Sequence, residues 1–599
     1  MDVTAAGVEA LTVNAEGANV VDLSGVDAAE SLTVTGAGDL TVEGVGAALK
    51  TVDASAAEGA VDVDLGGTTD VTSVLTGAGD DTIRAEAGDD LTANATINGG
   101  EGNDRLVLTG TGTAQYAMAG IETLALGNLG GALTFSARDI EGLQTIEATS
   151  DLVNTDTATF ARLGGTDLNF DLMADEAAAN AAGTIQADHS GATTVNVAGE
   201  EEDDTSATNL TLTNSNNVVL NVAADSIYNG TLQANSASAI EADIQGALGA
   251  AAAITATRAT SANITTEEDS VLALTAGALT DLNVTAAGDF TLAGGDVSGV
   301  EALTVETAGV FTATAVTFDA VNQVNLSGNG SVLLNNLGAN DLEYGITVNA
   351  EGLADGLSIE DMNVGEGQSI TLNADNVLGN VDLTGHTATV ANNTGSITAN
   401  VDGVSGTVDL GTLVAADVTV NAEGALSTVD AIITADTATV NGGGLGANNI
   451  DVTAAESATV TGGIAGDVIT VTGSSLGGEN AAFTLTGDLG NDQFDVNAGT
   501  GSTTVSITDF AAGNDTITSA SGVDVSAAEA VAILDAAFGI TAAEADIQLV
   551  DLDFNGDSNT EDGFVYDGNT YFSSADAFAD GVVAVQLAGV TLADDAVIA

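Results

Sequence analysis

Short runs of β-favouring residues, alternating with small polar residues, dominate this sequence. Examples are LTV at Leu11–Val13, LTVTGAGDLTV from Leu32, VDVDL from Val61 and VNLSGNGSVLL from Val324. Val, Leu or Ile recurs at about every second position, and Gly, Asn or Asp bounds each run. This pattern is typical of short β-strands that bury one face and are separated by tight turns. It predicts an all-β chain.

Internal repeats suggest how the strands are arranged. TVNAEG begins at Thr12, Thr347 and Thr419, and VEALTV begins at Val8 and Val300. Strand, tight turn and strand, with Asn and Asp at the corners, suits a parallel β-solenoid whose coils bury their faces against one another. An aromatic content of 3% also fits a narrow stacked core. The irregular turn spacing leaves tandem β-sandwich modules as the alternative, and it does not by itself predict regular T-x-T ranks on every coil.

Helical signals are few and lie mostly near the carboxy terminus. Ser526 with Glu529 resembles a capping box, and so does Thr541 with Glu544. The Ala-rich stretch 173–182 is a third candidate helix.

We expect four parts in the chain. Residues 1–120 form a β-repeat region with calcium motifs, and residues 121–480 form a repetitive β body. Residues 481–520 form a second calcium segment, and residues 521–599 form a small mixed α/β module.

Charge makes metal ions important. The chain has 87 Asp and Glu against 6 Lys and Arg, a formal net charge of -81, yet it is 44% hydrophobic. It can therefore bury a core, while self-repulsion opposes compaction. Divalent cations relieve this repulsion, and Ca²⁺ is the expected cofactor. So few basic residues argue against nucleic acid and anionic membranes as partners, and the absence of Cys excludes disulfides and thiolate sites.

The sharpest motif is GGEGNDRLV at Gly99–Val107, which matches the nonapeptide G-G-x-G-x-D-x-U-x. Its glycines permit tight turns, its Asp supplies a hard oxygen ligand, and its apolar residue faces the core of the following strand. Two weaker copies precede it, at Thr76–Arg84 and Ala85–Ala93. The predicted calcium residues of this first cluster are Gly77, Gly79, Asp81, Gly88, Asp90, Gly99, Gly100, Gly102 and Asp104.

A second occurrence, GDLGNDQFD at Gly487–Asp495, is followed by ITDFAAGNDTI from Ile507. These segments resemble the repeats-in-toxin (RTX) calcium-binding proteins, in which a segment like ITDFAAGNDTI closes the β-roll before a carboxy-terminal type I secretion signal. The resemblance implies calcium-binding roles for Gly99, Gly100, Gly102, Asp104, Gly487, Gly490 and Asp492. A long tandem array is missing, so it implies short calcium-bound patches and no extended β-roll.

A third acidic segment, DLDFNGDSNTED, lies near the carboxy terminus. It places Asp551, Asp553, Asn555, Asp557, Asn559 and Asp562 at positions 1, 3, 5, 7, 9 and 12 of a loop. That spacing can wrap oxygen ligands around one calcium ion, as in an EF-hand loop. An acidic turn between two strands is the alternative interpretation.

Catalysis is not expected. The two histidines, His189 and His386, are far apart in sequence, and the chain contains neither an H-E-x-x-H motif nor Trp. The amino-terminal sequence lacks the basic and apolar regions of a cleaved signal peptide, so no Sec-type signal is expected there. The RTX resemblance implies type I-like secretion instead.

Taken as a whole, the chain resembles S-layer and related type I secreted surface-fibre proteins of bacteria. That resemblance implies an extracellular structural protein that folds and self-assembles with calcium into a layer or filament at the cell surface. The alternatives are a secreted adhesin that binds a glycan, such as a cell-surface polysaccharide, or another surface, and a carbohydrate-active β-helix enzyme. No insertion into the membrane is expected.

Overall fold

The computed structural model describes the chain except residues 137–138, 150–151, 153–155, 175–182, 200, 202–203, 339–341, 352, 475–479, 498, 519–521, 524, 554–560, 576–577, 579–581, 594–595 and 598–599. Nearly all regular structure is β-strand, and strands pair in parallel with strands one coil away. The predicted parallel β-solenoid is confirmed, and tandem β-sandwich modules are excluded. The chain divides into two compact units, Met1–Val297 and Ser298–Ala599, which are described separately.

Unit 1 contains two long parallel ladders and two smaller sheets. The first ladder is β1 (Asp2–Thr4), β3 (Asn19–Gly25), β5 (Leu40–Gly44), β7 (Val61–Asp64), β9 (Thr82–Glu86), β11 (Arg105–Thr109), β14 (Thr123–Leu126), β17 (Thr145–Ala148), β19 (Leu168–Met173), β21 (Thr193–Ala198), β24 (Val218–Val222), β27 (Ala239–Ile244), β30 (Ser261–Thr266) and β32 (Asp281–Ala286). The second ladder is β12 (Gly112–Ala114), β15 (Ala132–Ser136), β18 (Thr157–Ala161), β20 (Thr184–Asp188), β23 (Asn209–Thr213), β26 (Thr231–Gln233), β29 (Ala253–Thr255), β31 (Ser270–Thr275) and β33 (Phe290–Asp296).

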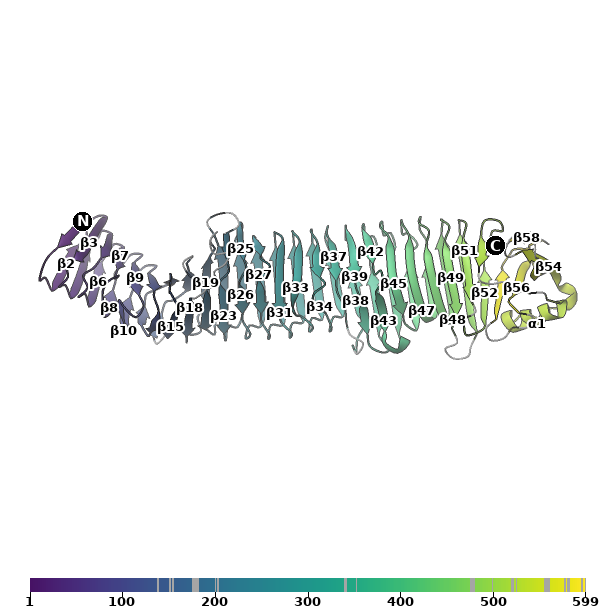
Figure 1. Cartoon of the computed structure of the whole chain (residues 1–599), viewed down its shortest axis with the longest axis horizontal. Helices are drawn as coiled ribbons and strands as arrows, with labels where there is room; N and C mark the ends of the chain where they lie inside the picture. The colour runs from purple at the N-terminus through teal and green to yellow at the C-terminus, as the bar shows by residue number, and fades with distance from the viewer. Residues whose placement is uncertain are drawn as a thin grey trace. The chain divides into compact units, whose positions relative to one another are not determined.

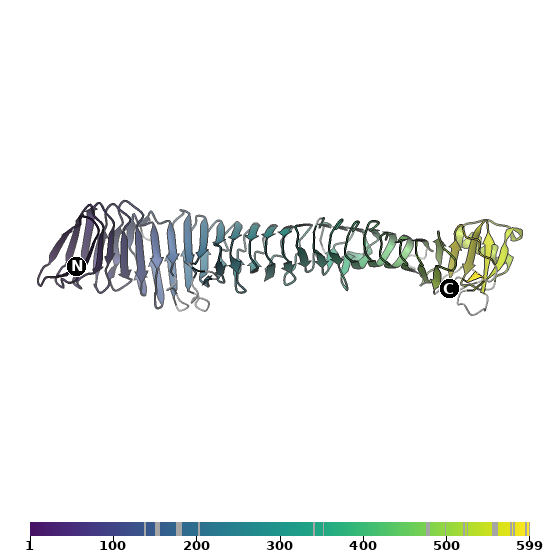
Figure 2. The ribbon, with the colours of Figure 1, turned by 90° about the horizontal axis from the view of Figure 1, so that it is seen from above.

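The smaller sheets of unit 1 complete its coils. One is β2 (Ala10–Asn14), β4 (Ser31–Gly36), β6 (Thr51–Ala57), β8 (Val71–Leu75), β10 (Leu91–Asn98), β13 (Ala117–Ala119) and β16 (Asp139–Glu141); the other is β22 (Asp204–Ser206), β25 (Ser226–Tyr228) and β28 (Ala247–Leu248). Figure 2 shows the purple and blue strands of this unit lying side by side.

Unit 2 also contains two long parallel ladders. The first, which we call ladder A, is β34 (Ala302–Thr307), β36 (Gln323–Ser327), β38 (Ile346–Asn349), β41 (Ser369–Asn373), β44 (Ser396–Asn400), β46 (Asp417–Asn421), the second halves of β47 (Val429–Asn441) and β48 (Asn449–Gly463), β50 (Ala481–Asp488) and β52 (Thr503–Ile507). The second, ladder B, is β35 (Phe311–Ala313), β37 (Ser331–Leu334), β39 (Gly356–Ile359), β42 (Asn380–Asp382), β45 (Val408–Val414), the first halves of β47 and β48, β49 (Val468–Gly473), β51 (Gln493–Asn497) and β53 (Thr516–Thr518). Figure 1 shows these strands stacked coil after coil.

Shorter elements fill the remaining turns of unit 2. β40 (Met362–Val364) and β43 (Thr387–Val390) pair with each other, β43 also pairs with the second half of β45, and the short 3₁₀ helix η2 (Ala391–Asn393) follows β43.

The repeated TVNAEG shows how this sequence makes a coil. In the copy that begins at Thr347, Val348 and Ala350 are fully buried, whereas Thr347 and Asn349 face outward. Small buried side chains let the opposite walls of each coil approach closely, which fits the low aromatic content. The number of residues in one coil varies. Asn400 forms a hydrogen bond with Asn373, 27 residues earlier, whereas Asn441 forms one with Asn421, 20 residues earlier.

The variable coil length is absorbed at the corners, so the strands of ladder A stay in register. Thr371 lies opposite Thr398, and Thr419 lies opposite Thr439. Regular outward ranks of Thr therefore do form in unit 2. The irregular turn spacing does not disturb these ranks, because the extra residues lie in corners and not in strands.

The end of unit 2 is a mixed module, as expected. It contains α1 (Ala527–Phe538), the 3₁₀ helix η3 (Glu544–Asp546), the antiparallel strands β54 (Gln548–Asp553), β55 (Glu561–Tyr566), β56 (Asn569–Ser573) and β57 (Val583–Leu587), and β58 (Ala596–Val597). β57 pairs in parallel with β52 and so joins the module to the last coil. Buried Ala530, Ile533 and Leu534 of α1 pack with Phe564 and Tyr571 of the strands.

Two of the three helix predictions can be judged. The capping box at Ser526 and Glu529 is present and begins α1, which ends at Gly539 in the left-handed conformation. The box predicted at Thr541 and Glu544 is wrong, because η3 is a single 3₁₀ turn without a side-chain cap. In the third stretch, Met173 ends strand β19 and residues 175–182 lie outside the described residues.

Candidate metal centres

Asp81 and Asp104, predicted calcium ligands of the first cluster, occupy the same corner on neighbouring coils of unit 1. Asp81 directly precedes β9, and Asp104 directly precedes β11. Because these strands pair with Thr82 opposite Arg105, the two aspartates lie one above the other. Glu122, directly before β14, takes the same place on the next coil. We call Asp81, Asp104 and Glu122 column 1.

Each side chain of column 1 holds the backbone of the preceding coil. The N–H of Val61 donates to Asp81 Oδ1 at 2.6 Å, the N–H of Asp81 donates to Asp104 Oδ1 at 2.8 Å, and the N–H of Asp104 donates to Glu122 Oε2 at 2.8 Å. Asp81 Oδ2 also accepts a hydrogen bond from the N–H of Gly77 at 3.1 Å, within its own corner. The carboxylates therefore fasten successive corners together in addition to carrying charge.

Burial disfavours the charged form of the aspartates in column 1. Asp81 and Asp104 are each only 1% exposed. Burial raises the pKa of Asp104 to about 6, and the negative charges of Asp81 and Glu122 act in the same direction. Burial also raises the pKa of Asp81. Asp104 Oδ2 is buried and has no hydrogen-bond partner among the described residues.

The arginines beside column 1 bind other carboxylates. Arg84 forms an ion pair with Asp62, and Arg105 forms one with Glu147 at 2.8 Å. Both pairs lie on the outward side of the strands. These ion pairs neutralise Asp62 and Glu147 on the strand surface. The two arginines therefore do not neutralise the carboxylates of column 1.

Asp90, from the third copy of the motif, lies at a different corner. It precedes β10, in the smaller sheet, and its Oδ2 accepts a hydrogen bond from the N–H of Glu86 at 2.7 Å. Its side chain is 3% exposed, and burial raises its pKa. The structure thus brings Asp81 and Asp104 together and places Asp90 apart from them.

Asp492, from the second motif, belongs to a longer column in unit 2. Asn448, Asp467, Asp492 and Asp515 each precede a strand segment of ladder B on successive coils. We call these four residues column 2.

The hydrogen bonds of column 2 repeat those of column 1. Oδ1 of Asn448 accepts from the N–H of Val429 at 3.0 Å, and Oδ1 of Asp467 accepts from the N–H of Asn448 at 2.7 Å. Oδ1 of Asp492 accepts from Asp467 at 2.9 Å, and Oδ1 of Asp515 accepts from Asp492 at 3.0 Å. Burial raises the pKa of Asp492 to about 6, with the charges of Asp515 and Asp467 adding to the effect. Burial also raises the pKa of Asp467.

The motif glycines serve two purposes. Gly79, Gly88, Gly100 and Gly102 have positive φ angles, whereas Gly77, Gly99, Gly487 and Gly490 lie where a Cβ would overlap neighbouring atoms. A Cβ on Gly99 would overlap Asp104 Oδ2, and a Cβ on Gly487 would overlap Asp492 Oδ2. Asp488 stands where the first motif has Gly100, and it keeps the left-handed conformation with φ 69°. Asp tolerates this conformation better than most residues, so the departure from the motif does not disturb the turn.

The donor chemistry of both columns fits calcium, which prefers hard oxygen ligands from carboxylates and backbone carbonyls. The unpartnered Asp104 Oδ2 is a free, buried oxygen of this kind. Among the described residues, however, no three His, Cys, Asp or Glu side chains lie close enough together to hold a metal ion. Backbone carbonyls would therefore have to supply most ligands at each site.

The predicted EF-hand-like loop lies only partly within the described residues. Asn555, Asp557 and Asn559 fall outside them. The backbones of Asp551 and Asp553 belong to β54, that of Asp562 belongs to β55, and the two strands pair in antiparallel fashion with Asp551 opposite Asp562. Strands and not helices therefore flank this loop.

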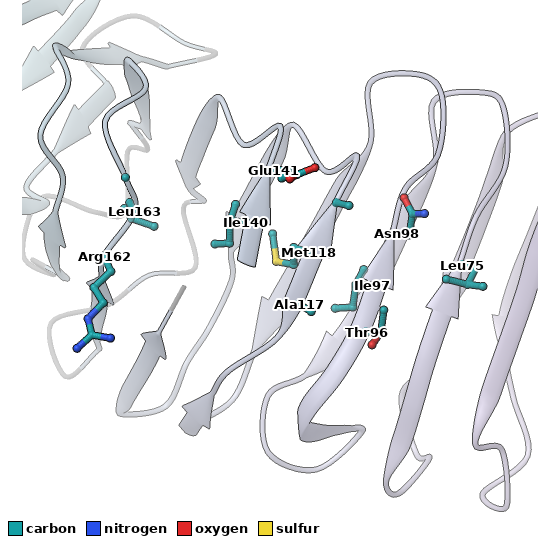
Figure 3. A pocket seen from close by; sticks show the side chains of 12 residues that line it. Leu75, Thr96, Ile97, Asn98, Ala117, Met118, Ile140, Glu141, Arg162 and Leu163 are labelled. Atoms are coloured by element: carbon teal, nitrogen blue, oxygen red, sulfur yellow. The ribbon is translucent and has the colours of Figure 1, made fainter. Parts of the chain in front are cut away.

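A sizeable cavity lies in unit 1, apart from the columns. Its volume is about 490 Å³, and it runs along β8, β10, β13 and β16 (Figure 3). Its larger apolar side chains are Leu75, Ile97, Met118, Ile140 and Leu163, and Asn98, Glu141 and Arg162 supply polar groups. The lining thus contains one carboxylate and one cation, Glu141 and Arg162.

Sequence reasoning missed several members of the columns. Glu122, Asn448, Asp467 and Asp515 were not predicted as site residues. A usable signal was present: GGIAGDVIT around Asp467 and FAAGNDTIT around Asp515 both place Gly and an acid just before a β-favouring run. Sequence reasoning also did not predict that the outward Asn of TVNAEG forms hydrogen bonds between coils.

Comparison with known proteins adds no relative. No known protein family, curated protein or solved structure matches this chain. In the described part of the chain, no helix is long and apolar enough to cross a membrane. Fold and sites together define an acidic parallel β-solenoid with buried carboxylate columns.

Proposed function

We propose that this chain is an extracellular structural protein that calcium folds and that then assembles with further copies of itself. The observation that carries the proposal is the coincidence of the RTX-like motifs with columns 1 and 2, where carboxylates are buried next to one another. Adjacent buried anions disfavour the folded state unless protons or cations neutralise them. At neutral pH, a bound cation is the available remedy.

The side chains that would contribute ligands, at sites completed mainly by backbone carbonyls, are Asp81, Asp104 and Glu122 in column 1, and Asp467, Asp492 and Asp515 in column 2. When bound, the ion supplies positive charge beside these carboxylates. The carboxylates themselves hold the backbone N–H groups of the preceding coil, so neutralising them favours the docking of one coil on the next. Folding and ion binding are then linked in the same residues.

Calcium linkage would suit a secreted protein. Where calcium is scarce, a net charge of -81 favours an unfolded chain that can be exported. Outside the cell, calcium at roughly millimolar levels fills weak extracellular-type sites. We therefore propose type I-like secretion and a final location at the cell surface, as part of a layer or filament.

A calcium titration tests this proposal. Purified chain is placed in chelator, calcium is added, and circular dichroism, light scattering and electron microscopy follow folding and assembly, with magnesium as the control ion. A coil-to-β transition with ordered sheets or filaments near millimolar calcium is the expected result. A chain already folded in chelator, and monomeric throughout, would contradict it.

A pair of double variants localises the effect. The double variant Asp104→Asn with Asp492→Asn removes one buried charge from each column. It should shift the calcium concentration at the midpoint of the coil-to-β transition. Asp80→Asn with Asp488→Asn removes two exposed charges from the same corners and should leave it nearly unchanged. Equal shifts in both double variants would show that net charge, and not the columns, senses calcium.

An adhesin is the second candidate function, and one feature favours it. A hollow of about 300 Å³ on unit 2 is lined by Thr304, Asn325, Asn349 and Glu351. Hydroxyl, amide and carboxylate groups of this kind can hydrogen-bond a sugar. Binding of a neutral or acidic glycan to the folded chain, lost in Asn325→Ala, would favour the adhesin.

A further inference from the structure

Outward side chains of ladder A form a regular polar surface on unit 2. Thr, or Ser in the last rank, occupies one column on successive coils, and Asn or Thr occupies the column two residues further on. We call this surface the T-x-N face, and its ranks are Thr347 and Asn349, Thr371 and Asn373, Thr398 and Asn400, Thr419 and Asn421, Thr439 and Asn441, Thr459 and Thr461, Thr484 and Thr486, and Ser506 and Thr508.

The amides of the T-x-N face bond to one another. From coil to coil, Nδ2 of each Asn donates to Oδ1 of the Asn before it, at 2.9 Å from Asn373 to Asn349, 2.8 Å from Asn400 to Asn373, and 2.8 Å from Asn421 to Asn400. Much of the amides' hydrogen-bonding capacity is therefore already used within the chain. Covering this surface costs less desolvation than covering free amides would.

Charge is absent from both columns of the T-x-N face. None of its side chains is Asp, Glu, Lys or Arg, although the chain carries 87 acidic residues. The first ladder of unit 1 offers a contrast, because Glu147, Asp171, Glu241 and Asp243 face outward in its two central columns. Two copies of so acidic a chain would repel each other through most surfaces, but not through the T-x-N face.

We propose that the T-x-N face binds the same face of a second copy of this chain. The inference deepens the proposed assembly and rests on it. The two sheets pack face to face, in the manner of the dry paired sheets in which Asn ladders and interdigitated side chains stabilise the contact. An isologous contact of this kind forms a pair with two-fold symmetry, which would be the unit from which a layer or filament is built.

The size of the face is sufficient for a stable pair. Eight ranks at about 4.8 Å per coil span about 35 Å. The two columns together with the outward position before them give a width of about 18 Å; the acid at that third position is Asp417, which accepts a hydrogen bond from Thr437 Oγ1. The contact would thus cover about 600 Å² on each copy, or about 1,200 Å² in total, at the lower end of specific interfaces. Acidic Glu351, Asp375, Asp402 and Glu423 flank the face and would lie at its rim, where solvent and salt screen them.

A charge-insertion experiment tests the pairing. Thr398→Glu with Thr439→Glu places two charges two coils apart on the T-x-N face. The matched control, Thr434→Glu with Thr472→Glu, places two charges two coils apart on ladder B. All four threonines face outward, so each variant should fold, which circular dichroism checks. Sedimentation velocity then measures self-association of the full chain in calcium and in chelator.

We expect the face variant to self-associate at least about tenfold more weakly than the native chain, and the control to pair normally. Thr398→Lys with Thr439→Lys should also fail to pair with itself, but an equimolar mixture of the Glu and Lys variants should pair again. That rescue depends on contact between the two faces. Equal weakening of face and control variants, or no rescue in the mixture, would overturn the proposal.

The two proposals fail in different ways. If the chain folds without calcium, yet the face variant alone loses pairing, the calcium function is wrong and the interface stands. If calcium folds the chain, but face and control variants associate alike, the interface is wrong and the calcium function stands. Loss of glycan binding in the face variant, with association unchanged, would identify the surface as an adhesin site instead.

Discussion

Replacing Asp492 by Asn isolates the energetic cost of one buried carboxylate. The side chain is 2% exposed, and its pKa is raised from 3.8 to about 6. A raised folded-state pKa means that the folded chain binds the proton more tightly than the unfolded chain does. The corresponding stability is present below pH 4 and is lost as the pH rises through about 6.

The magnitude follows from the same shift. Above pH 6, ionised Asp492 destabilises the calcium-free folded state by up to about 3 kcal/mol. An Asn there keeps an acceptor for the N–H of Asp467, as Asn448 already does for the N–H of Val429 in the same column. Asp492→Asn should therefore raise the free energy of unfolding in chelator at pH 8 by about 1–3 kcal/mol, and by much less at pH 4.

Folding in chelator, driven by a stabilising osmolyte and followed by circular dichroism at both pH values, measures this difference. Asp488→Asn is the matched control, since Asp488 is exposed, lies in the same corner and has a φ that Asn adopts readily. Its effect should stay within about 0.5 kcal/mol. A variant Asp492→Asn no more stable than the native chain at pH 8, or equally affected at both pH values, would refute the reasoning.

Three further substitutions probe the solenoid in chemical unfolding experiments. Asn400→Ala removes two ladder hydrogen bonds and should cost about 1–3 kcal/mol, whereas Asn441→Ala, at the end of the Asn run, should cost about half as much. Gly99→Ala should cost at least about 2 kcal/mol, because its Cβ would overlap backbone and side-chain oxygens; a loss below 1 kcal/mol would show that this corner relaxes easily. Ser526→Ala removes the N-cap of α1 and should cost about 1 kcal/mol; a neutral effect would mean that packing alone holds the helix.

The sequence predicted the class of fold because period-two patterning and turn residues are local signals. Val348 and Ala350 of TVNAEG are buried, as alternation requires, and the box at Ser526 begins a helix because an apolar run follows it. The box at Thr541 fails because its chain leads within a few residues into β54. Local signals fix an element only when the following residues can extend it.

Local sequence patterns do not predict the register between coils. Asn400 stacks on Asn373 and Asn441 on Asn421, at separations of 27 and 20 residues, so no fixed period announces the columns. The aspartates of the RTX-like motifs were recognised singly for the same reason. Asp104 stacks on Asp81 and accepts a hydrogen bond from its backbone N–H. This arrangement depends on the lengths of the corners, which only the folded chain reveals.

The structure keeps acidic residues out of the two columns of the T-x-N face. Columns 1 and 2 bury carboxylates within the coils, whereas the T-x-N face carries none. If calcium acts at the columns, it controls whether the coils fold, and the neutral face can form only after they do. Contact between neutral faces is weakly screened by salt, whereas repulsion among exposed carboxylates is strongly screened. Calcium would then govern assembly through folding, and ionic strength would act mainly on the acidic surfaces that keep the pairs apart.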